Sequence, residues 1–312
     1  MKLRITDFPR RIALTATLAL GSLGIAHAAL PPATISFETT GFNHMNTQLI
    51  RGSTLHFANP TNSSLPLAIV RWRGPESRVV ARFTVPAHGG LVNWKPKRDG
   101  LYVFYDTQNT RFGGVPIQGE GTERVFQPVA KKHSPYFPVP VYGIVAVTNA
   151  NGGGIPVSTS YGKFEVPGKS TLHNNLHPFM NDSKDRPWME VPGGTMTFKP
   201  WVVVVRAGQP LHVFDYDAMA HAFFPGDYPV MRVDHGKVST YHYTFTGFVL
   251  KKNGGHKTIS FQKPGLYHIL CIIHSYPWEH TYKSRTFYGG FPYVMDAVVV
   301  VEPSTKTTGG LA

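Results

Sequence analysis

The stretch KPGLYHILCIIH, residues 263–274, sets the expected fold, because a similar stretch, RDGLYVFYDTQN, occupies residues 98–109. In both, a turn that contains glycine precedes a run of apolar and aromatic residues. Runs of this kind, bounded by turn residues, are typical of β-strands. Similarity between two separated parts of one chain indicates an internal duplication. The sequence therefore predicts the same strand in two copies.

Two further pairs of stretches repeat in the same order along the chain. RGSTLHFANP (51–60) resembles AGQPLHVFDY (207–216), and FPVPVYGIVAVT (137–148) resembles FPYVMDAVVVV (291–301). The chain has 31 Gly and 26 Pro, which separate short strand-like runs, and no segment has helical periodicity. We therefore predict an all-β protein built from two tandem β-sandwiches.

The N-terminal residues are typical of a cleaved signal peptide. Basic residues precede an apolar run over 12–25, and a small-x-small site follows at 26–28. We expect general secretion rather than the twin-arginine route, and a periplasmic or secreted protein. The predicted organisation is a signal peptide at 1–28, a first domain at 29–150, a linker or wrapping segment at 151–195, a second domain at 196–303 and a flexible tail at 304–312.

The chain is basic, with 31 Lys and Arg against 18 Asp and Glu and a formal net charge of +13. The basic residues are dispersed, with only short runs such as KPKR at 95–98. This distribution argues against nucleic-acid binding, which favours a basic stripe with interleaved aromatic residues. An acidic protein partner, an anionic surface or an acidic medium fits better. No segment after the signal approaches 18 apolar residues, so no transmembrane span is expected.

The single cysteine of the chain, Cys271, has no second cysteine with which to form an internal disulfide. It belongs to a polar set that the first copy lacks. The paired positions are Cys271 with Asp106, His274 with Asn109, His221 with roughly Leu65, and Met295 with Tyr142. Because the first copy keeps the strand pattern without these residues, they are not needed to fold the unit, and a functional role is expected for them.

A thiolate, two imidazoles and a thioether form a soft donor set that suits copper in both of its oxidation states. Zinc is the competing metal, but structural zinc sites use paired C-x-x-C spacing, which this chain lacks. The predicted site is one copper ion held by the side chains of His221, Cys271, His274 and Met295.

The second copy resembles the cupredoxin family of blue-copper proteins. The resemblance is carried by RAGQPLHVFDYDAMAH (206–221), by PGLYHILCIIH (264–274) and by a methionine before the last strand. It covers roughly residues 196–303, with a ligand-free copy at roughly 33–149. It implies two Greek-key β-sandwiches, a type 1 copper ion in the second, and one-electron transfer with a redox protein partner, possibly an acidic one such as a cytochrome.

One feature departs from the cupredoxin pattern. Cupredoxins usually place the axial methionine a few residues beyond the second histidine, whereas Met295 lies 21 positions beyond His274. Glu279 and His280 are the alternative axial ligands. Met295 is favoured because its strand has a counterpart in the first copy.

Other histidines have structural interpretations. His268 is out of phase with Cys271 on the same strand, so it is expected on the other face. His212 matches His56 of the ligand-free copy, which favours a scaffold role. A further group forms either a second copper site or a solvated loop: His173, His177 and Met180.

An enzyme is less favoured than an electron carrier. None of the 15 histidines forms an H-x-H pair, and Cys271 is flanked by Leu270 and Ile272 rather than by histidine. Multicopper oxidases, which the two-domain build resembles, use H-x-H pairs and histidines beside the cysteine for a trinuclear copper cluster. Copper nitrite reductases use a histidine beside the cysteine for a second copper. Two alternatives stay open: copper binding and delivery, and an oxidoreductase with an open copper position near Glu279 and His280.

Overall fold

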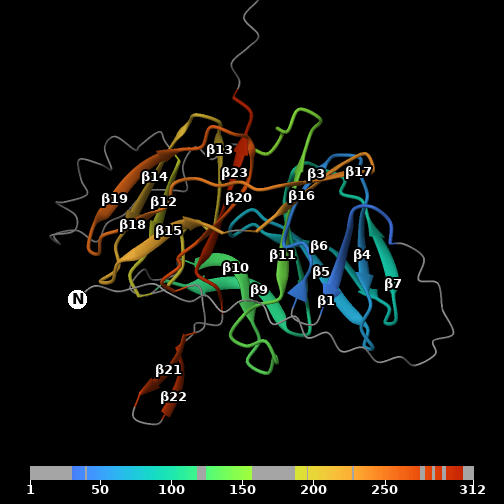
Figure 1. Cartoon of the computed structure of the whole chain (residues 1–312), viewed down its shortest axis with the longest axis horizontal. Coiled ribbons are helices and arrows are strands. Elements are labelled where there is room, and N and C mark those ends of the chain that lie inside the picture. The colour runs from blue at the N-terminus through green and yellow to red at the C-terminus, as the bar shows by residue number, and fades with distance from the viewer. Residues whose placement is uncertain are drawn as a thin grey trace, which may run out of the picture. The chain divides into compact units, whose positions relative to one another are not determined.

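The computed structural model describes residues 30–38, 41–117, 124–156, 187–194, 196–226, 228–274 and 293–304, and the backbone of 278–282 and 285–289. Within these residues the chain is all-β, as predicted (Figure 1). These residues contain no helix of sufficient length and apolar character to cross a bilayer.

The strands fall into two sequential groups. The first group is β1 (Thr34–Glu38), β2 (Gly41–Phe42), β3 (Asn46–Ile50), β4 (Leu55–Asn59), β5 (Leu65–Arg71), β6 (Arg78–Val85), β7 (Gly90–Trp94), β8 (Gly100–Asp106), β9 (Thr110–Pro116), β10 (Arg124–Ala130) and β11 (Tyr142–Thr148). The second group is β12 (Trp188–Val191), β13 (Val202–Arg206), β14 (Pro210–Asp215), β15 (His221–Pro225), β16 (Val230–Asp234), β17 (Lys237–Tyr241), β18 (Phe248–Leu250), β19 (Gly255–Ser260), β20 (Gly265–Leu270), β21 (Trp278–Tyr282), β22 (Arg285–Gly289) and β23 (Asp296–Glu302).

The two groups repeat one pairing scheme. In the first half, β1 runs parallel to β4, β4 pairs with β7, and a second sheet has the order β3-β11-β8-β5-β6. In the second half, β12 runs parallel to β14, β14 pairs with β19, and the second sheet has the order β13-β23-β20-β15-β18. In both halves the outer pair of the second sheet is parallel, β3 with β11 and β13 with β23. The predicted tandem sandwiches are therefore present.

The registers show which positions correspond. Gly100 lies opposite Val147 in the first half, and Gly265 lies opposite Val301 in the second, so β8 matches β20 residue by residue. Asp106 and Asn109 therefore correspond to Cys271 and His274, and the pairing of β5 and β15 matches Leu65 to His221. One expected match is wrong by one position.

The residue that corresponds to Met295 is Val141, not Tyr142. Tyr142 lies opposite Tyr105, and Asp296 lies opposite Leu270, the counterpart of Tyr105. Tyr142 and Asp296 are thus the equivalent pair, and the residue before each of them is apolar. Alternate residues of a strand face opposite sides of the sheet. Val141 and Met295 therefore face the core of their own sandwich, whereas Tyr142 and Asp296 face the other side.

The apolar strands are buried on both faces. Every residue of β8, β11, β20 and β23 is buried. One face of these strands lines the core of its own sandwich, and the other contributes to a third core shared by both halves, which includes Val103, Ile144, Val202 and Val298. A strand covered on both sides has a continuous apolar sequence instead of an alternating one, which explains the valine runs at 202–205 and 298–301.

The second half extends into the first. β16 lies parallel to β3 and adds β17 at its other side, so the sheet of the first half becomes seven-stranded with the order β17-β16-β3-β11-β8-β5-β6. Met231 and Val233 of β16 pack into the core of the first sandwich. The described residues from 31 onward belong to one compact unit, because the shared sheet and the shared core join the two sandwiches.

The predicted linker at 151–195 contains a strand near its end. β12 pairs with β14, so residues 188–191 belong to the second sandwich. Their short apolar run, WMEV, offers little periodicity from which a strand could be recognised. The predicted domain boundaries otherwise stay a prediction, and the signal segment at 1–28 lies outside the described residues.

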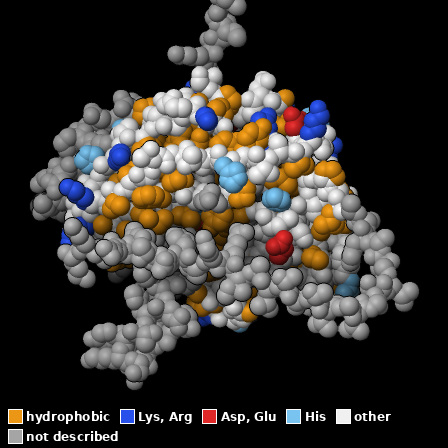
Figure 2. All heavy atoms as spheres, in the orientation of Figure 1, with side chains coloured by type: hydrophobic (Ala, Val, Ile, Leu, Met, Phe, Trp, Pro, Cys, Tyr) orange, Lys and Arg blue, Asp and Glu red, His pale blue; other side chains and the backbone are white. Residues whose placement is uncertain are grey.

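Basic side chains are scattered over the face of the molecule that Figure 2 shows, among apolar and uncharged side chains and few acidic ones. This dispersed charge agrees with the distribution in the sequence, where the net charge of +13 is not gathered into one long basic run.

Candidate metal centre

Three predicted ligands come from two strand ends of the second sandwich. His221 is the first residue of β15, Cys271 directly follows β20, and His274 ends the tight turn that begins at Cys271. β15 and β20 are neighbours in the sheet, so the two ends lie side by side. In the turn, the backbone N–H of His274 donates to the carbonyl of Cys271 over 2.9 Å, which returns the imidazole toward the sulfur.

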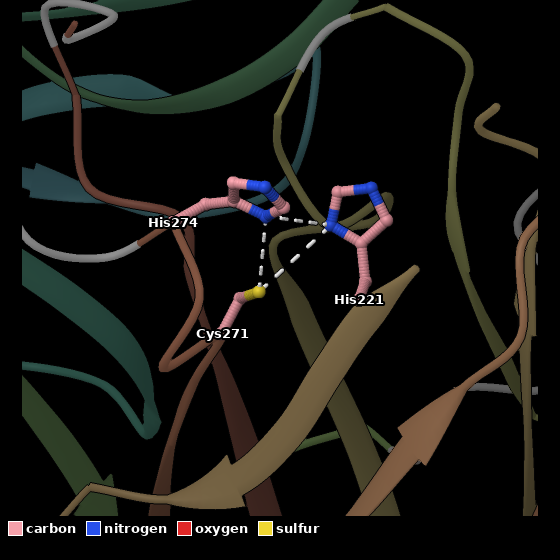
Figure 3. A group of neighbouring side chains, drawn as sticks. All are labelled: His221, Cys271 and His274. Atoms are coloured by element: carbon pink, nitrogen blue, oxygen red, sulfur yellow. Dashed lines mark hydrogen bonds between the residues drawn. The ribbon is translucent and has the colours of Figure 1, made fainter. Parts of the chain in front are cut away.

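The donor atoms of the three side chains form a compact triangle (Figure 3). The Sγ of Cys271 lies 3.8 Å from Nδ1 of His221 and 3.3 Å from Nδ1 of His274, and the two nitrogens are 3.1 Å apart. A point in their plane that is equidistant from all three lies about 2 Å from each, close to the bond lengths of nitrogen and thiolate ligands to a metal such as zinc. The three atoms therefore fit one metal ion.

Asp217 determines which ring nitrogen of His221 carries the proton and which has a free lone pair. The carboxylate of Asp217 lies 3.0 Å from Nε2 of His221, and both side chains are buried. A carboxylate only accepts hydrogen bonds, so the ring proton is on Nε2 and Nδ1 carries a free lone pair. Burial, the larger effect, lowers the pKa of His221, and the hydrogen bond to Asp217 opposes it. The neutral imidazole is the form that binds metals.

The sulfur of Cys271 is buried and accepts hydrogen bonds from the backbone. The N–H of Ala222 donates to Sγ over 3.3 Å, and Cys271 is 0% exposed. Burial raises the pKa of the Cys271 thiol, while the N–H groups of Ala222, Ile273 and His274 act in the opposite direction. A metal that binds this sulfur must therefore displace a proton, as metal binding to a thiol generally does.

His274 is the ligand at the surface. It is partly exposed, whereas His221 is 0% exposed. Burial is the largest effect on His274 and lowers its pKa, and the nearby His221 lowers it further. The imidazole of His221 is therefore enclosed by protein. The imidazole of His274 lies nearer the surface, close in sequence to Ile272, which is 45% exposed.

Met295 lies next to Cys271 through the backbone. The N–H of Cys271 donates to the carbonyl of Met295 over 3.0 Å. The Met295 side chain is 1% exposed and belongs to the same apolar core as Cys271 and Phe223. The strand order thus brings the predicted fourth residue beside the triangle despite its separation along the chain.

The remaining candidate ligands lie outside the described residues. For Glu279 and His280 only the backbone, in β21, is described. The possible second group, His173, His177 and Met180, falls in the undescribed segment 157–186.

His268 is not part of the triangle. As predicted from its phase on the strand, it lies on the opposite face from Cys271 and is 3% exposed. Its Nε2 is 2.6 Å from Oδ2 of Asp296, and its Nδ1 is 3.4 Å from the amide nitrogen of Asn46 in the first half.

Asp296 is the centre of a buried polar network between the two halves. The indole N–H of Trp201 donates to its Oδ1 over 2.9 Å, and the hydroxyl of Tyr142 donates to its Oδ2, the oxygen that also contacts His268. Burial raises the pKa of Tyr142 strongly, so the phenol stays a donor. Three partners satisfy a buried carboxylate that would otherwise be costly. Because Asp296 directly follows Met295, the network also fixes the backbone at the metal centre.

His212 and His56 have matching scaffold contacts. The Nδ1 of His56 lies 2.7 Å from Oδ1 of Asn93, and the Nδ1 of His212 lies 2.9 Å from Oγ1 of Thr258. In each sandwich the histidine and its partner are directly opposite on neighbouring strands. These cross-strand pairs stabilise a sheet and agree with the predicted scaffold role.

Sequence reasoning missed the residues that orient the ligands. Asp217 was detectable in principle, because a metal-binding histidine usually donates its other ring N–H to a carboxylate, a carbonyl or water, and Asp217 lies four positions before His221. The network of Asp296 was not detectable, because Tyr142 is 154 positions away. No local pattern signals such a contact.

No family model and no curated protein matches this chain. Among solved structures, amicyanin from Paracoccus versutus (Thiobacillus versutus) is similar at 18% identity, with 38% of this chain and 82% of that chain covered and a TM-score of 0.24. A novel purple cupredoxin from Nitrosopumilus maritimus is similar at 15% identity, with 37% of this chain and 99% of that chain covered and a TM-score of 0.23. Similarity at this level carries no functional inference, so the function proposed below rests on the strand pairing and on the atoms of the site.

Proposed function

We propose that this protein is an exported mononuclear copper protein that transfers single electrons. His221, Cys271 and His274 would hold one type 1 copper ion, with Met295 as the fourth ligand. The observation that carries the proposal is the triangle of one sulfur and two imidazole nitrogens, all within 4.8 Å of one another. A copper ion bound there supplies the ability to accept and release one electron. The protein supplies the donors, their protonation states and the exclusion of water.

The chemistry of the donors supports copper over other metals. Thiolate and thioether sulfur favour Cu(I), and imidazole suits both Cu(I) and Cu(II). Asp217 holds the lone pair of His221 toward the site, and the N–H of Ala222 holds the sulfur. Donors that are fixed before the ion binds need little rearrangement when its charge changes by one. Fixed donors therefore favour rapid electron transfer.

The side chains that pack around Cys271 and Met295 are mostly apolar. Cys271 and Met295 belong to a core of fully buried side chains that includes Ala222 and Phe223. An apolar shell limits the access of water and destabilises the more highly charged oxidation state, which raises the reduction potential. His274, as the partly exposed ligand, is the route by which electrons reach or leave the site.

The partner and the compartment follow from charge and from the N-terminus. Without residues 1–28, which hold four basic residues and one acidic residue, 27 Lys and Arg remain against 17 Asp and Glu. The resulting net charge of +10 attracts an acidic redox protein, such as an acidic cytochrome, and accelerates their encounter. The signal-like segment at 1–28 directs the protein to the periplasm or the medium.

Reconstitution with copper tests the proposal. The copper-free protein, titrated with Cu(II), should bind one equivalent and develop an intense visible absorption band from thiolate-to-copper charge transfer. Cys271→Ser should lose the band. Asp106→Ser, at the matching position of the first half, should keep it. A wild-type protein with no such band, or a Cys271→Ser variant with an unchanged band, would contradict the proposal.

Electrochemistry separates an electron carrier from the alternatives. A carrier should give a reversible one-electron wave and retain its copper against a competing chelator. More than one copper per chain with ready exchange would instead indicate copper delivery. Turnover of oxygen, nitrite or nitric oxide would indicate an oxidoreductase. Preferential binding of Zn(II), with no redox wave, would exclude the proposed role.

A further inference from the structure

A pocket of about 350 Å³ lies in the first half, at the edge of the metal-free sandwich. β6 ends the seven-stranded sheet and β7 ends the four-stranded sheet, and the pocket forms where these two strands meet the turn at 95–98. Its lining is Arg71, Arg78, Val80, Ala81, Trp94, Lys95, Lys97, Arg98 and Tyr102. The volume is that of a site for a small molecule.

The polar lining of this pocket is almost entirely cationic. Five of the nine lining residues are Arg or Lys, and none is Asp or Glu. Arg71 donates to the backbone carbonyl of Asp99 over 2.8 Å, and the carboxylate of Asp99 is bonded to Arg51 instead. Among the described residues, none of the five cations forms an ion pair with a carboxylate. Like charges gathered around one cavity repel each other and concentrate anions there.

The floor of the pocket is rigid. Trp94 is 8% exposed and Tyr102 is 4% exposed, and their rings contact edge to face with centroids 5.2 Å apart. The Tyr102 hydroxyl donates to the carbonyl of Arg98 over 2.7 Å, which fixes the turn that carries the lysines. Burial raises the pKa of Tyr102, and the positive charges of Arg71 and Arg98 oppose this effect.

The second half shows that the fold does not require two of these cations, Lys95 and Lys97. Tyr267, the counterpart of Tyr102, donates to the carbonyl of Lys263 over 2.8 Å, so the same turn with the same hydrogen bond recurs there. Counting back from that turn, Lys263 matches Arg98, but Gln262 matches Lys97 and Ser260 matches Lys95. The turn therefore folds without two of the positive charges, and their presence in the first half needs another reason.

We propose that this pocket binds a small polyanion with two or more anionic oxygens, such as a tricarboxylate or a di- or polyphosphate. Arg71 is partly buried and presents a planar fork of donors that matches a carboxylate or phosphate group. Lys95 and Lys97 are exposed and add charge at the rim. The concave shape and the limited volume favour a small ligand over a segment of a protein. The site is separate from the proposed copper centre and goes beyond the proposed function.

Calorimetry on the full-length protein at low ionic strength tests this proposal. Tricarballylate and inorganic pyrophosphate are the two probes, and acetate is the monoanionic reference. We expect one probe molecule per chain, bound at least about tenfold more tightly than acetate. The tighter of the two probes identifies the anion as a carboxylate or a phosphate. The affinity should be the same with and without copper, so failure of the copper proposal would leave this result unaffected.

Two matched double variants separate a built site from general charge. Lys95→Ser with Lys97→Gln places the residues of the second half in the first and should weaken binding at least about tenfold. Lys251→Ser with Lys252→Gln removes the same charge from exposed positions of the second half and should change binding by less than about twofold. All four side chains are exposed, and unchanged thermal unfolding will confirm folding.

Three results would overturn the proposal. Absence of saturable binding is one, and equal weakening by both double variants, as expected for long-range attraction alone, is another. Binding of an acidic peptide but of neither small probe is the third, because it would identify the surface as a protein contact.

Discussion

At the end of β8, the first half places Asp106 and Asn109 where the end of β20 in the second half places Cys271 and His274. In the first half these side chains satisfy each other: the amide of Asn109 donates to Asp106, which also accepts the N–H of Gln108 over 2.8 Å. In the second half the matching side chains point their donor atoms at one shared point.

The remaining two positions differ in the same way. Leu65 and Val141 are buried apolar residues where the second half has His221 and Met295. One backbone scaffold thus supports either a closed, self-satisfied strand end or an open set of donors. The fold does not require these ligand residues, because the first half forms without them, so exchanges between the halves help to separate metal binding from stability.

Exchange at the second histidine should have the largest effect. His274→Asn introduces the residue of the first half at a partly exposed position, so folding is retained. Loss of one of three close donors should lower copper affinity roughly 1,000-fold, or about 4 kcal/mol. The reverse change, Asn109→His, should leave the stoichiometry at one copper. A competition titration measures both, and a second bound copper in Asn109→His would break the comparison.

Asp215 and its counterpart Asn59 should differ in their response to pH. Both are 0% exposed and lie opposite a glycine, but Asn59 donates to two carbonyls, whereas Oδ2 of Asp215 has no partner among the described residues. Burial raises the pKa of Asp215 to about 8. Between its unfolded pKa near 4 and this value, only the unfolded chain loses the proton, so stability falls as pH rises.

We expect Asp215 to contribute a fall of about 3 kcal/mol to the free energy of unfolding of the copper-free protein between pH 5 and pH 8. His221 and His274 act in the opposite direction because their pKa values are lowered, so the contribution of Asp215 is read as the difference between the wild type and Asp215→Asn. Asp215→Asn, which introduces the residue of the first half, should remove most of this fall. Urea unfolding at several pH values measures it. Parallel curves for the wild type and the variant would show that Asp215 is ionised in the folded protein.

Asp217→Asn tests the partner of the enclosed histidine. The amide removes the charge and weakens the preference for the proton on Nε2 of His221. Such partners contribute about 10- to 100-fold in metal affinity, so an intermediate loss is expected, with the visible band retained but shifted. Copper titration and absorption spectroscopy measure the two effects. An unchanged affinity would mean that the strand alone orients His221.

Tyr142→Phe tests whether the first half supports the metal centre and should have the smallest effect. It removes one donor to the carboxylate of Asp296 and should cost about 1.5 kcal/mol in stability, with a change in the reduction potential of the bound copper. Tyr102→Phe is the control. It removes a hydroxyl that donates to the carbonyl of Arg98, and neither residue belongs to the metal centre. It should lower stability only. Equal potentials in both variants would show that the network has a structural role alone.

The repeated fold and three members of the site could be predicted from sequence because they depend on local patterns. Strand-forming runs, turn residues and the C-x-x-H spacing of Cys271 and His274 are all visible within a few residues. The match of Met295 was wrong by one position, although the Phe-Pro pairs at 137–138 and 291–292 align Val141 with Met295 in the sequence. The contribution of β16 to the first sheet was not predicted, since the sequence of a strand does not indicate which sheet it joins.

By itself, the sequence determined that the chain forms strands, that the strands repeat, and that only the second copy carries the Cys, His and Met donors at the matched positions. Tertiary structure decided which atoms meet. His221 and Cys271 are 50 positions apart and come together because β15 and β20 pair, and Asp296 finds Tyr142 because two sheets pack face to face. The physical reason is that backbone preferences act between near neighbours in the chain, whereas the meeting of distant side chains depends on the packing of whole sheets.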